Sequence, residues 1–281
     1  MNRSTASLAI LLAATLVSAS AAAQPTGVEA PVIAGPSYAD LAGLAERAPL
    51  VIKAEIRRQA RVKQERAPGL APGFARLYVE ARTEALISGT VPVGEELRYL
   101  VDVPLTDRGR APRLKGESVI LFARPVPGRP GEIQLVDTGA QRPAGPALEA
   151  RLRPILAELV APDAPPAITG VAEALSVRGT LVGESETQLF LDTENDGPVS
   201  VTVVRRPGQA PRWGVSWTEI VDQSAAAPQR DTLAWYRLAC SLPRTLPADA
   251  LITNDADARE LANRDYAFVI EQLGPCTRAS V

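Results

Sequence analysis

Between residues 175 and 221, apolar and polar side chains alternate with a period of two. Residues 199–203 read Val-Ser-Val-Thr-Val, and residues 213–217 read Trp-Gly-Val-Ser-Trp. This alternation is typical of β-strands with one buried face. The dipeptides Asp-Gly at 196–197 and Pro-Gly at 207–208 favour tight turns between strands. The stretch therefore predicts three or four antiparallel strands in a meander.

Five strand-like segments precede this meander: residues 52–57, 77–84, 97–103, 119–123 and 133–135. The first three alternate apolar with polar positions, whereas 119–123 is a continuous apolar run, as in a strand buried on both faces. Five short strands behind a helix predict a small closed barrel of the OB type. The predicted fold class is therefore α+β and β-rich: an OB-like five-stranded barrel, then an antiparallel β-meander packed with C-terminal helices.

Two helices are predicted around the first set of strands. Ser37 and Asp40 have the spacing of a capping box, in which each side chain accepts a hydrogen bond from the other residue's backbone. Pro49 ends this helix, because proline cannot donate to the helical ladder. A second helix is predicted over residues 147–160, where Pro154 must kink it or begin a second piece.

Two further helices are predicted near the C-terminus. Asp231 or Thr232 caps a helix that runs to about Leu242, and the pair at 254–255 (Asn-Asp) caps the last helix. Gly274 ends that helix, because glycine readily adopts the left-handed conformation found just past a helix C-terminus.

The first 23 residues have the organisation of a secretory signal peptide. Arg3 charges the n-region, residues 8–17 form an apolar run, and residues 21–23 supply an Ala-x-Ala cleavage site. The run is too short to span a bilayer. The alternative is a buried N-terminal helix. Cleavage after Ala23 predicts a periplasmic or secreted protein, with no membrane span in the mature chain.

These patterns divide the chain into five parts. The expected boundary between two modules is the stiff stretch Ala-Pro-Asp-Ala-Pro-Pro at residues 161–166. The parts are the signal peptide (1–23), a flexible leader (24–36), the OB-like β-barrel module (37–140), a helix and Pro-rich linker (141–166), and the β-meander plus helical C-terminal module (167–281).

The amino-acid composition limits the catalytic groups, metal ligands and partners that are possible for this protein. The 281 residues include no histidine, which excludes the commonest general base, the commonest zinc ligand and every Ser-His or Cys-His nucleophile pair. Loss of the signal peptide removes one of the 30 basic residues and none of the 32 acidic ones, which leaves a net charge of −3. This mild acidity disfavours nucleic acid as a partner.

Cys240 and Cys276 are the two cysteines of the chain. In an exported protein an even pair is most simply one disulfide, and we predict one here. The alternative, two free thiols in redox or metal chemistry, has no Cys-x-x-Cys motif or histidine beside it. On the chain-entropy model, the crosslink restricts the unfolded ensemble by about 4 kcal/mol.

Two stretches resemble known families. A helix, a strand at 50–57, a long second strand and the sequence Leu-Lys-Gly-Glu-Ser at 114–118 before an apolar strand together resemble the netrin/TIMP-like OB modules of secreted proteins. The resemblance implies an OB fold, but the N-terminal cysteine that carries metalloprotease inhibition in that family is missing here. Residues 183–222 are similar to uncharacterised exported proteins of alphaproteobacteria, which implies export and no particular activity.

The sequence Asp192-x-Glu194-x-Asp196-Gly197 is similar to the first half of a calcium-binding loop, with oxygen ligands at alternate positions and glycine at the sixth. The twelfth position, where a bidentate glutamate belongs, is Val203. The favoured interpretation is an acidic hairpin turn whose residues tolerate positive φ. No metal site is therefore predicted, and these acids stay weak candidates.

Carboxylates are frequent in and near the meander. Two of them facing each other across a cleft could hydrolyse glycosidic bonds without histidine, but the favoured interpretation is a surface of solvated acids. The six are Glu184, Glu186, Asp192, Glu194, Glu219 and Asp222.

Five residues of the meander are candidate ligand-binding residues. Trp213 and Trp217 share one strand face, where they either stack on sugars or pack in the core. Arg205, Arg206 and Arg212 flank the Pro-Gly turn, where they either clamp a carboxylate or phosphate or end their strands in solvent.

The sequence thus predicts an exported, non-enzymatic binding or accessory protein. The rival hypothesis is a carboxylate-based hydrolase that acts on cell-envelope glycans. We predict no catalytic residue and no cofactor. The expected partner is a protein or glycan of the cell envelope.

Overall fold

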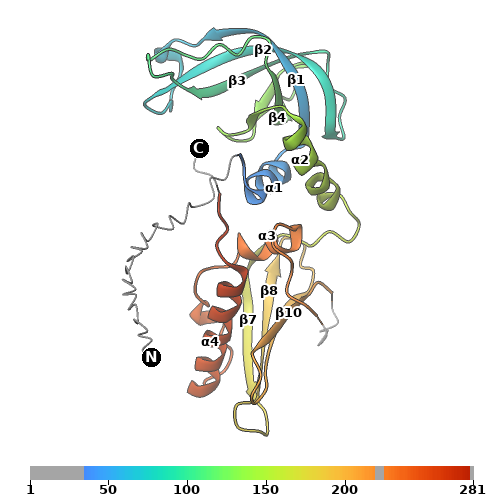
Figure 1. Cartoon of the computed structure of the whole chain (residues 1–281), viewed down its shortest axis with the longest axis vertical. Helices are drawn as coiled ribbons and strands as arrows, with labels where there is room; N and C mark the ends of the chain where they lie inside the picture. The colour runs from blue at the N-terminus through green and yellow to red at the C-terminus, as the bar shows by residue number, and fades with distance from the viewer. Residues whose placement is uncertain (1–34, 219–224, 279–281) are drawn as a thin grey trace, which may run out of the picture. The chain divides into compact units, whose positions relative to one another are not determined.

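The computed structural model describes residues 35–218 and 225–278 (Figure 1). Within them the chain forms four helices and two antiparallel sheets, which confirms the predicted α+β, β-rich class. The predicted signal peptide (1–23) and most of the predicted leader (24–36) lie outside the described residues, as do the candidate acids Glu219 and Asp222.

The first sheet has six strands in the order β3-β2-β1-β4-β5, with β6 also paired to β4. The strands are β1 (Leu50–Arg61), β2 (Phe74–Gly89), β3 (Glu96–Pro104), β4 (Ser118–Pro125), β5 (Ile133–Leu135) and β6 (Gln141–Pro143). Three register shifts interrupt the long pairing of β1 with β2. Such bulges bend a strand and increase its twist, so they curve this sheet.

The middle of the first sheet is buried on both faces. The five residues of 119–123 are all buried, which confirms the prediction made from their continuous apolar run. Val119 and Leu121 join the apolar cluster on the inner side of the sheet, whereas Ile120 and Phe122 pack with the helices on the other side. This alternation fixes which face of each neighbouring strand is free to meet solvent.

The strand pairings do not form a closed barrel, so the predicted OB-like barrel stays a prediction. The sheet ends at β3 and β5, and the only described pairing across this gap is one isolated parallel bridge between Arg98 and Glu132.

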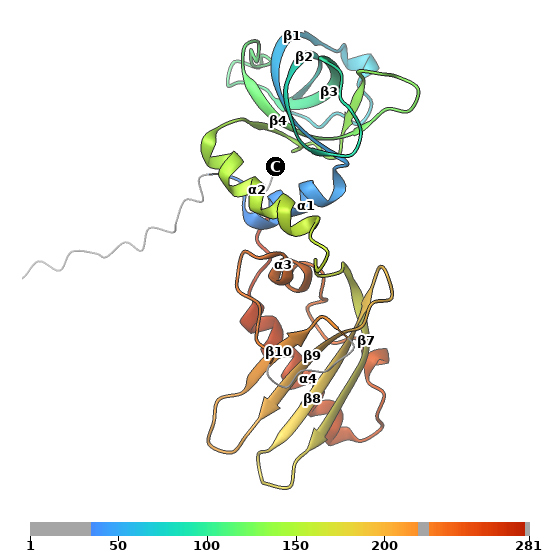
Figure 2. The ribbon, with the colours of Figure 1, turned by 90° about the vertical axis from the view of Figure 1, so that its right-hand side faces the viewer.

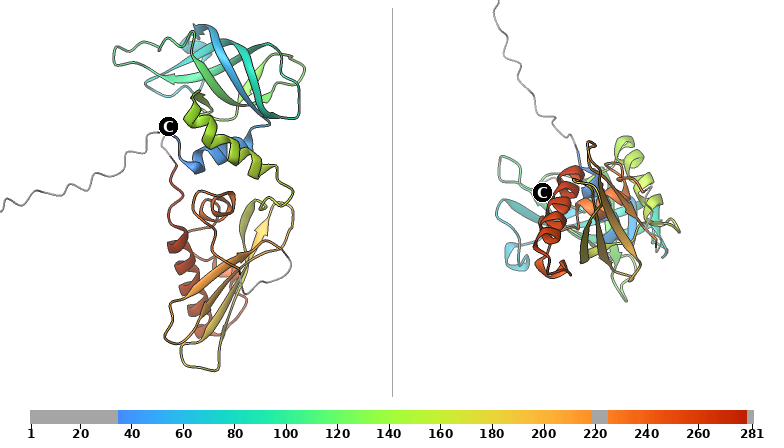
Figure 3. Two further views of the ribbon diagram at one scale, coloured as in Figure 1. Left: turned by 45° about the vertical axis from the view of Figure 1, so that its right-hand side comes forward. Right: turned by 90° about the horizontal axis from the view of Figure 1, so that it is seen from below.

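Helices α1 (Tyr38–Arg47) and α2 (Pro146–Leu159) pack against each other, and α1 also contacts β4. Figure 3 shows α2 beside the strands of the first sheet. The capping box predicted for α1 is present, because the Ser37 side chain accepts from the Asp40 backbone and the Asp40 side chain from the Ser37 backbone. Helix α2 continues through Pro154 as one element.

The second sheet has four strands in the order β10-β9-β8-β7, which confirms the meander (Figure 2). The strands are β7 (Ile168–Arg178), β8 (Ser185–Thr193), β9 (Val199–Arg205) and β10 (Arg212–Ser216).

Helices α3 (Leu233–Ala239) and α4 (Ala256–Leu273) complete this region, and α4 packs on β7 and β8 (Figure 1). Thr232 and Asp255 cap the two helices, and Gly274 ends α4 at a φ of 69°, as predicted. The predicted disulfide is confirmed: Cys240 and Cys276 are bonded, so the residue after α3 is tied to the segment after α4. Among the described residues, no helix has the length and apolar character needed to cross a membrane.

Candidate functional site

The strongest candidate site lies along β3, at one end of the first sheet. The buried residues of β3 are the odd-numbered ones, Leu97 to Val103, which face the apolar interior. The even-numbered Arg98, Leu100 and Asp102 point to the opposite face. Leu100 is an apolar residue on that otherwise polar face, and it is 50% exposed. Its cross-strand partner on β2 is Tyr78, which is 38% exposed. The pair forms an apolar patch on an otherwise charged surface.

The turn before β5 is hydrogen-bonded to β3 near Arg98 and closes one end of the gap between the two strands. The backbone N–H of Arg98 donates to the Gly131 carbonyl at 2.8 Å. Gly131 has a φ of 80°, and a Cβ added there would lie 3.1 Å from the Glu96 carbonyl oxygen. Glycine is thus required for this approach, both by its backbone conformation and by the space.

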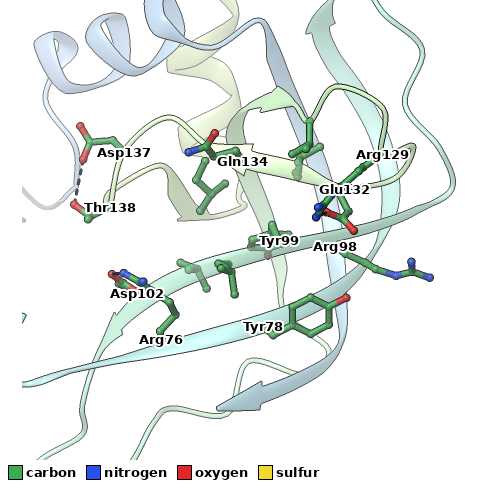
Figure 4. Close-up of a pocket in the computed structure, with 15 residues that line it drawn as sticks. Arg76, Tyr78, Arg98, Tyr99, Asp102, Arg129, Glu132, Gln134, Asp137 and Thr138 are labelled. Carbon is green, nitrogen blue, oxygen red and sulfur yellow. Dashed lines mark hydrogen bonds and ion pairs between the residues drawn. The ribbon is translucent and has the colours of Figure 1, made fainter. Parts of the chain in front are cut away.

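Beyond Arg98 the described residues form no further bridge between the two strands, and a groove opens between them (Figure 4). Its volume is about 730 Å³, which is within the range of small-ligand sites. In Figure 4 Arg76 and Tyr78 lie on β2, Arg98 and Tyr99 on β3, and Arg129 and Glu132 on the β4–β5 hairpin. The lining is completed by Leu100, Val101, Asp102, Val126, Ile133, Gln134, Leu135, Asp137 and Thr138.

Ion pairs fix most of the charged groups of the groove. Arg76 donates from Nε and Nη2 to the two carboxylate oxygens of Asp102, at 2.7 and 2.8 Å. This bidentate hydrogen bonding raises the pKa of Arg76. Arg129 pairs with Glu132 at 3.2 Å. The Arg76–Asp102 pair is largely buried and bidentate, whereas the Arg129–Glu132 pair is more exposed to solvent.

Asp137 lies at the other end of the groove and is paired with Arg47 of α1 at 2.9 Å. Burial raises the pKa of Asp137, but hydrogen bonds from Thr138 and from the Gly139 backbone, together with the charge of Arg47, outweigh that effect. The pKa of Asp137 therefore lies below its ordinary value, and the group remains a carboxylate at neutral pH.

Arg98 differs from these residues, because among the residues that the structure describes its guanidinium has no ion-pair partner. The three arginines of the groove, at 76, 98 and 129, are balanced by the three acids at 102, 132 and 137. A net charge of zero does not favour a polyanion. It favours a ligand that is itself polar and mixed in charge.

The candidate arginines of the second sheet are divided between its two faces. Arg205 faces α4, where it is ion-paired with Asp265 and lies over the ring of Phe268. Arg206 and Arg212 line a separate cavity of about 270 Å³ on the opposite face. The expected cluster of three guanidiniums is therefore reduced to two.

One candidate tryptophan, Trp213, lies in β10, and the other, Trp217, follows its last residue. Trp213 and Trp217 are half-buried and pack against the apolar core of the sheet. Trp213 also forms part of the wall of the cavity that Arg206 and Arg212 line.

The described candidate acids do not form a facing pair. Glu184 lines a cavity at the β7–β8 turn, whereas Glu186 lines the cavity of Arg206 and Arg212. Near Asp192 and Glu194 the chain turns from β8 into β9, with Asp196 at a φ of 54°. There the Thr193 hydroxyl donates to the Gly197 carbonyl at 2.9 Å and the Gly197 N–H donates to the Asn195 side chain.

The sequence reasoning missed the groove of β3. One signal was present, since Leu100 breaks the alternation between Leu97 and Val103 with an apolar residue on the polar face. Within the described ranges, no group of three or more Cys, Asp or Glu residues is placed to hold a metal ion. No protein-family model matches this chain, and a search of curated proteins finds no significant match.

Proposed function

We propose that this protein is an exported binding or accessory protein without enzymatic activity, and that the groove between β3 and β5 is its ligand site. The observation that carries the proposal is the exposed pair Tyr78 and Leu100, set beside the unpaired Arg98 on the rigid framework of a sheet. An apolar patch with a few convergent polar groups is the usual composition of a binding site.

The groove acids support binding rather than catalysis. Asp102, Glu132 and Asp137 each have an arginine partner. An acid held in this way positions a guanidinium and is not free to act as a general acid on a substrate. The same arrangement disfavours glycan hydrolysis in this groove.

We also propose that the first sheet is an OB-like barrel of the netrin/TIMP-like type. The strand order β3-β2-β1-β4-β5 and the parallel bridge from Arg98 to Glu132 support this, because they bring the two ends of the sheet together. In OB folds the face of the second and third strands and the loop between the fourth and fifth strands bind ligands. The groove lies at that place.

Export to the periplasm or the medium is part of the proposal. The organisation of residues 1–23 supports it, and so does the disulfide between Cys240 and Cys276, since disulfides persist in oxidising compartments.

The proposal is tested by capture from cell-envelope extract on the immobilised mature chain. Three proteins are compared: the wild type, Arg98→Glu in the groove, and Arg108→Glu, a control charge reversal at an exposed position outside it. The proposal predicts a protein or glycan that the wild type and the control retain and that Arg98→Glu loses. Equal capture by all three proteins would contradict it.

A further inference from the structure

The edge of β3 along the groove has a free stretch of backbone with defined ends. The Arg98 N–H points away from β2, since it donates to Gly131 on the hairpin. Backbone groups alternate in direction along a strand, so the N–H and C=O of Leu100 and Asp102 point the same way, into the groove. No bridge pairs either residue with β5 in the described chain.

Proline closes the other end of this stretch. Pro104 pairs with Phe74 of β2 and has no N–H to offer on the groove side. The free edge is therefore short, running from the bridge at Arg98 to Pro104. It offers two donors and two acceptors at the spacing of an extended chain, on the floor of a groove that also exposes side chains.

We propose that the groove binds an extended segment of a partner polypeptide, which adds as one more strand to the free edge of β3 at Leu100 and Asp102. This inference rests on the proposed function and names the ligand class of that site. Main-chain hydrogen bonds to an exposed strand edge give affinity in such complexes, and side-chain contacts on alternate residues give specificity.

Charge complementarity defines the partner segment. On the solvent face of β3 the order is a cation without an acidic partner, Arg98, then the apolar Leu100, then Asp102. Residues opposite each other on adjacent strands interact, and opposite charges are favoured. The position opposite Arg98 is already filled by Glu132 across the bridge. The partner segment thus carries an apolar residue opposite Leu100, where it also contacts Tyr78. Two positions away, at the end that meets the bridge, it carries an acidic residue within reach of the long Arg98 side chain.

The test uses a display library of random nonapeptides selected on the full mature chain. Enriched peptides are expected to share an acidic and an apolar residue two positions apart and to lack proline between them. Each is then measured for affinity on two matched variants. Leu100→Pro removes the edge N–H, and Leu100→Val keeps the N–H with a side chain of similar size. The proposal predicts that Leu100→Pro weakens binding at least ~10-fold and Leu100→Val less than ~3-fold.

A second measurement tests the same hydrogen bonds by modifying the peptide instead of the protein, in case Leu100→Pro does not fold. N-methylation of alternate residues of the best peptide is expected to abolish binding in one register and to leave it in the other. Equal binding by both N-methylated registers would overturn the proposal. So would equal affinities of the two Leu100 variants, or a selection that enriches no peptide.

Oligosaccharides released from the cell wall serve as the competing probe. If they bind the wild type, fail to bind Arg98→Glu, and bind Leu100→Pro and Leu100→Val equally, the groove is a ligand site but not a strand-binding one. That result would contradict the inference and leave the proposed function standing.

Discussion

Asp265 of α4 accepts a hydrogen bond from the Nε of Arg205 at 2.5 Å, and the Asp265 side chain is fully buried. Its second oxygen accepts from the Thr187 hydroxyl, which is in turn hydrogen-bonded to Ser176. The network joins α4 to β7, β8 and β9. One buried carboxylate therefore fixes how the last helix lies on the second sheet.

Removal of this carboxylate is predicted to destabilise the protein strongly. In Asp265→Ala the Arg205 guanidinium and the Thr187 hydroxyl lose their acceptor in a buried place, which costs about 3–5 kcal/mol when a buried pair is broken. The measurement is the free energy of unfolding in urea. Asp257→Ala on the same helix is the control, because its ion pair with Arg178 is 63% exposed on both sides and contributes at most about 1 kcal/mol. Equal losses in the two variants would show that the network does not hold α4.

Loss of the disulfide is predicted to lower stability by about 2–4 kcal/mol, because the crosslink restricts the unfolded chain over a separation of 36 residues. The variant is Cys240→Ala with Cys276→Ala, compared with the oxidised wild type in the same urea titration. A thiol assay on the native protein is expected to find no free thiol. Two reactive thiols, or an unchanged free energy of unfolding, would contradict this prediction.

Gly214 of β10 is predicted to tolerate no side chain. A Cβ at this position would lie 2.0 Å from the Ala225 carbonyl oxygen, so the crossing backbone would have to move. Gly214→Ala should therefore destabilise the protein by about 1–3 kcal/mol, as overpacking does. Gly94→Ala is the control, since its nearest atom would be 3.7 Å away, and we expect it to change stability by less than about 0.5 kcal/mol. The prediction fails if thermal denaturation shows the two variants to be alike.

Alkaline pH is predicted to unfold the protein through its buried tyrosines. Burial raises the pKa of four phenols, those of Tyr38, Tyr99, Tyr236 and Tyr266. Below about pH 10 these phenols are neutral in both the folded and the unfolded chain, so they do not make the free energy of unfolding depend on pH. Above it the unfolded chain loses their protons while the folded chain retains them, so stability falls as the pH rises.

Ultraviolet difference absorbance and circular dichroism, followed together against pH, test this point. The four phenols are expected to ionise only as the sheets unfold. Ionisation of all the tyrosines of the chain before any loss of circular dichroism would be inconsistent with their burial.

Elements whose signals are local could be predicted from the sequence. The caps at Ser37, Thr232 and Asp255 and the stop at Gly274 depend on a few neighbouring residues, and each has the expected geometry. The start of β7 could not be predicted in this way, because register shifts near Gly170 and Glu173 break the alternation of apolar and polar residues that indicates a strand. The three-residue β6 is too short to show any period.

The groove could not be predicted, because it depends on which strands come last in the sheet. Arg76 and Asp102 are far apart in the sequence and meet only because β2 and β3 pair in one register. The arginines of the second sheet show the opposite case. Arg205 ends β9 and Arg206 follows it, so the alternation of the strand leaves them on opposite faces, a separation that the period of two already implied.

Amide hydrogen exchange of the protein, with and without its captured partner, tests directly whether a partner strand adds to β3. We predict that binding slows exchange at the amides of Leu100 and Asp102, on the free edge of β3, more than anywhere on the second sheet. Protection confined to the second sheet, or unchanged exchange at both amides in the presence of saturating partner, would contradict it.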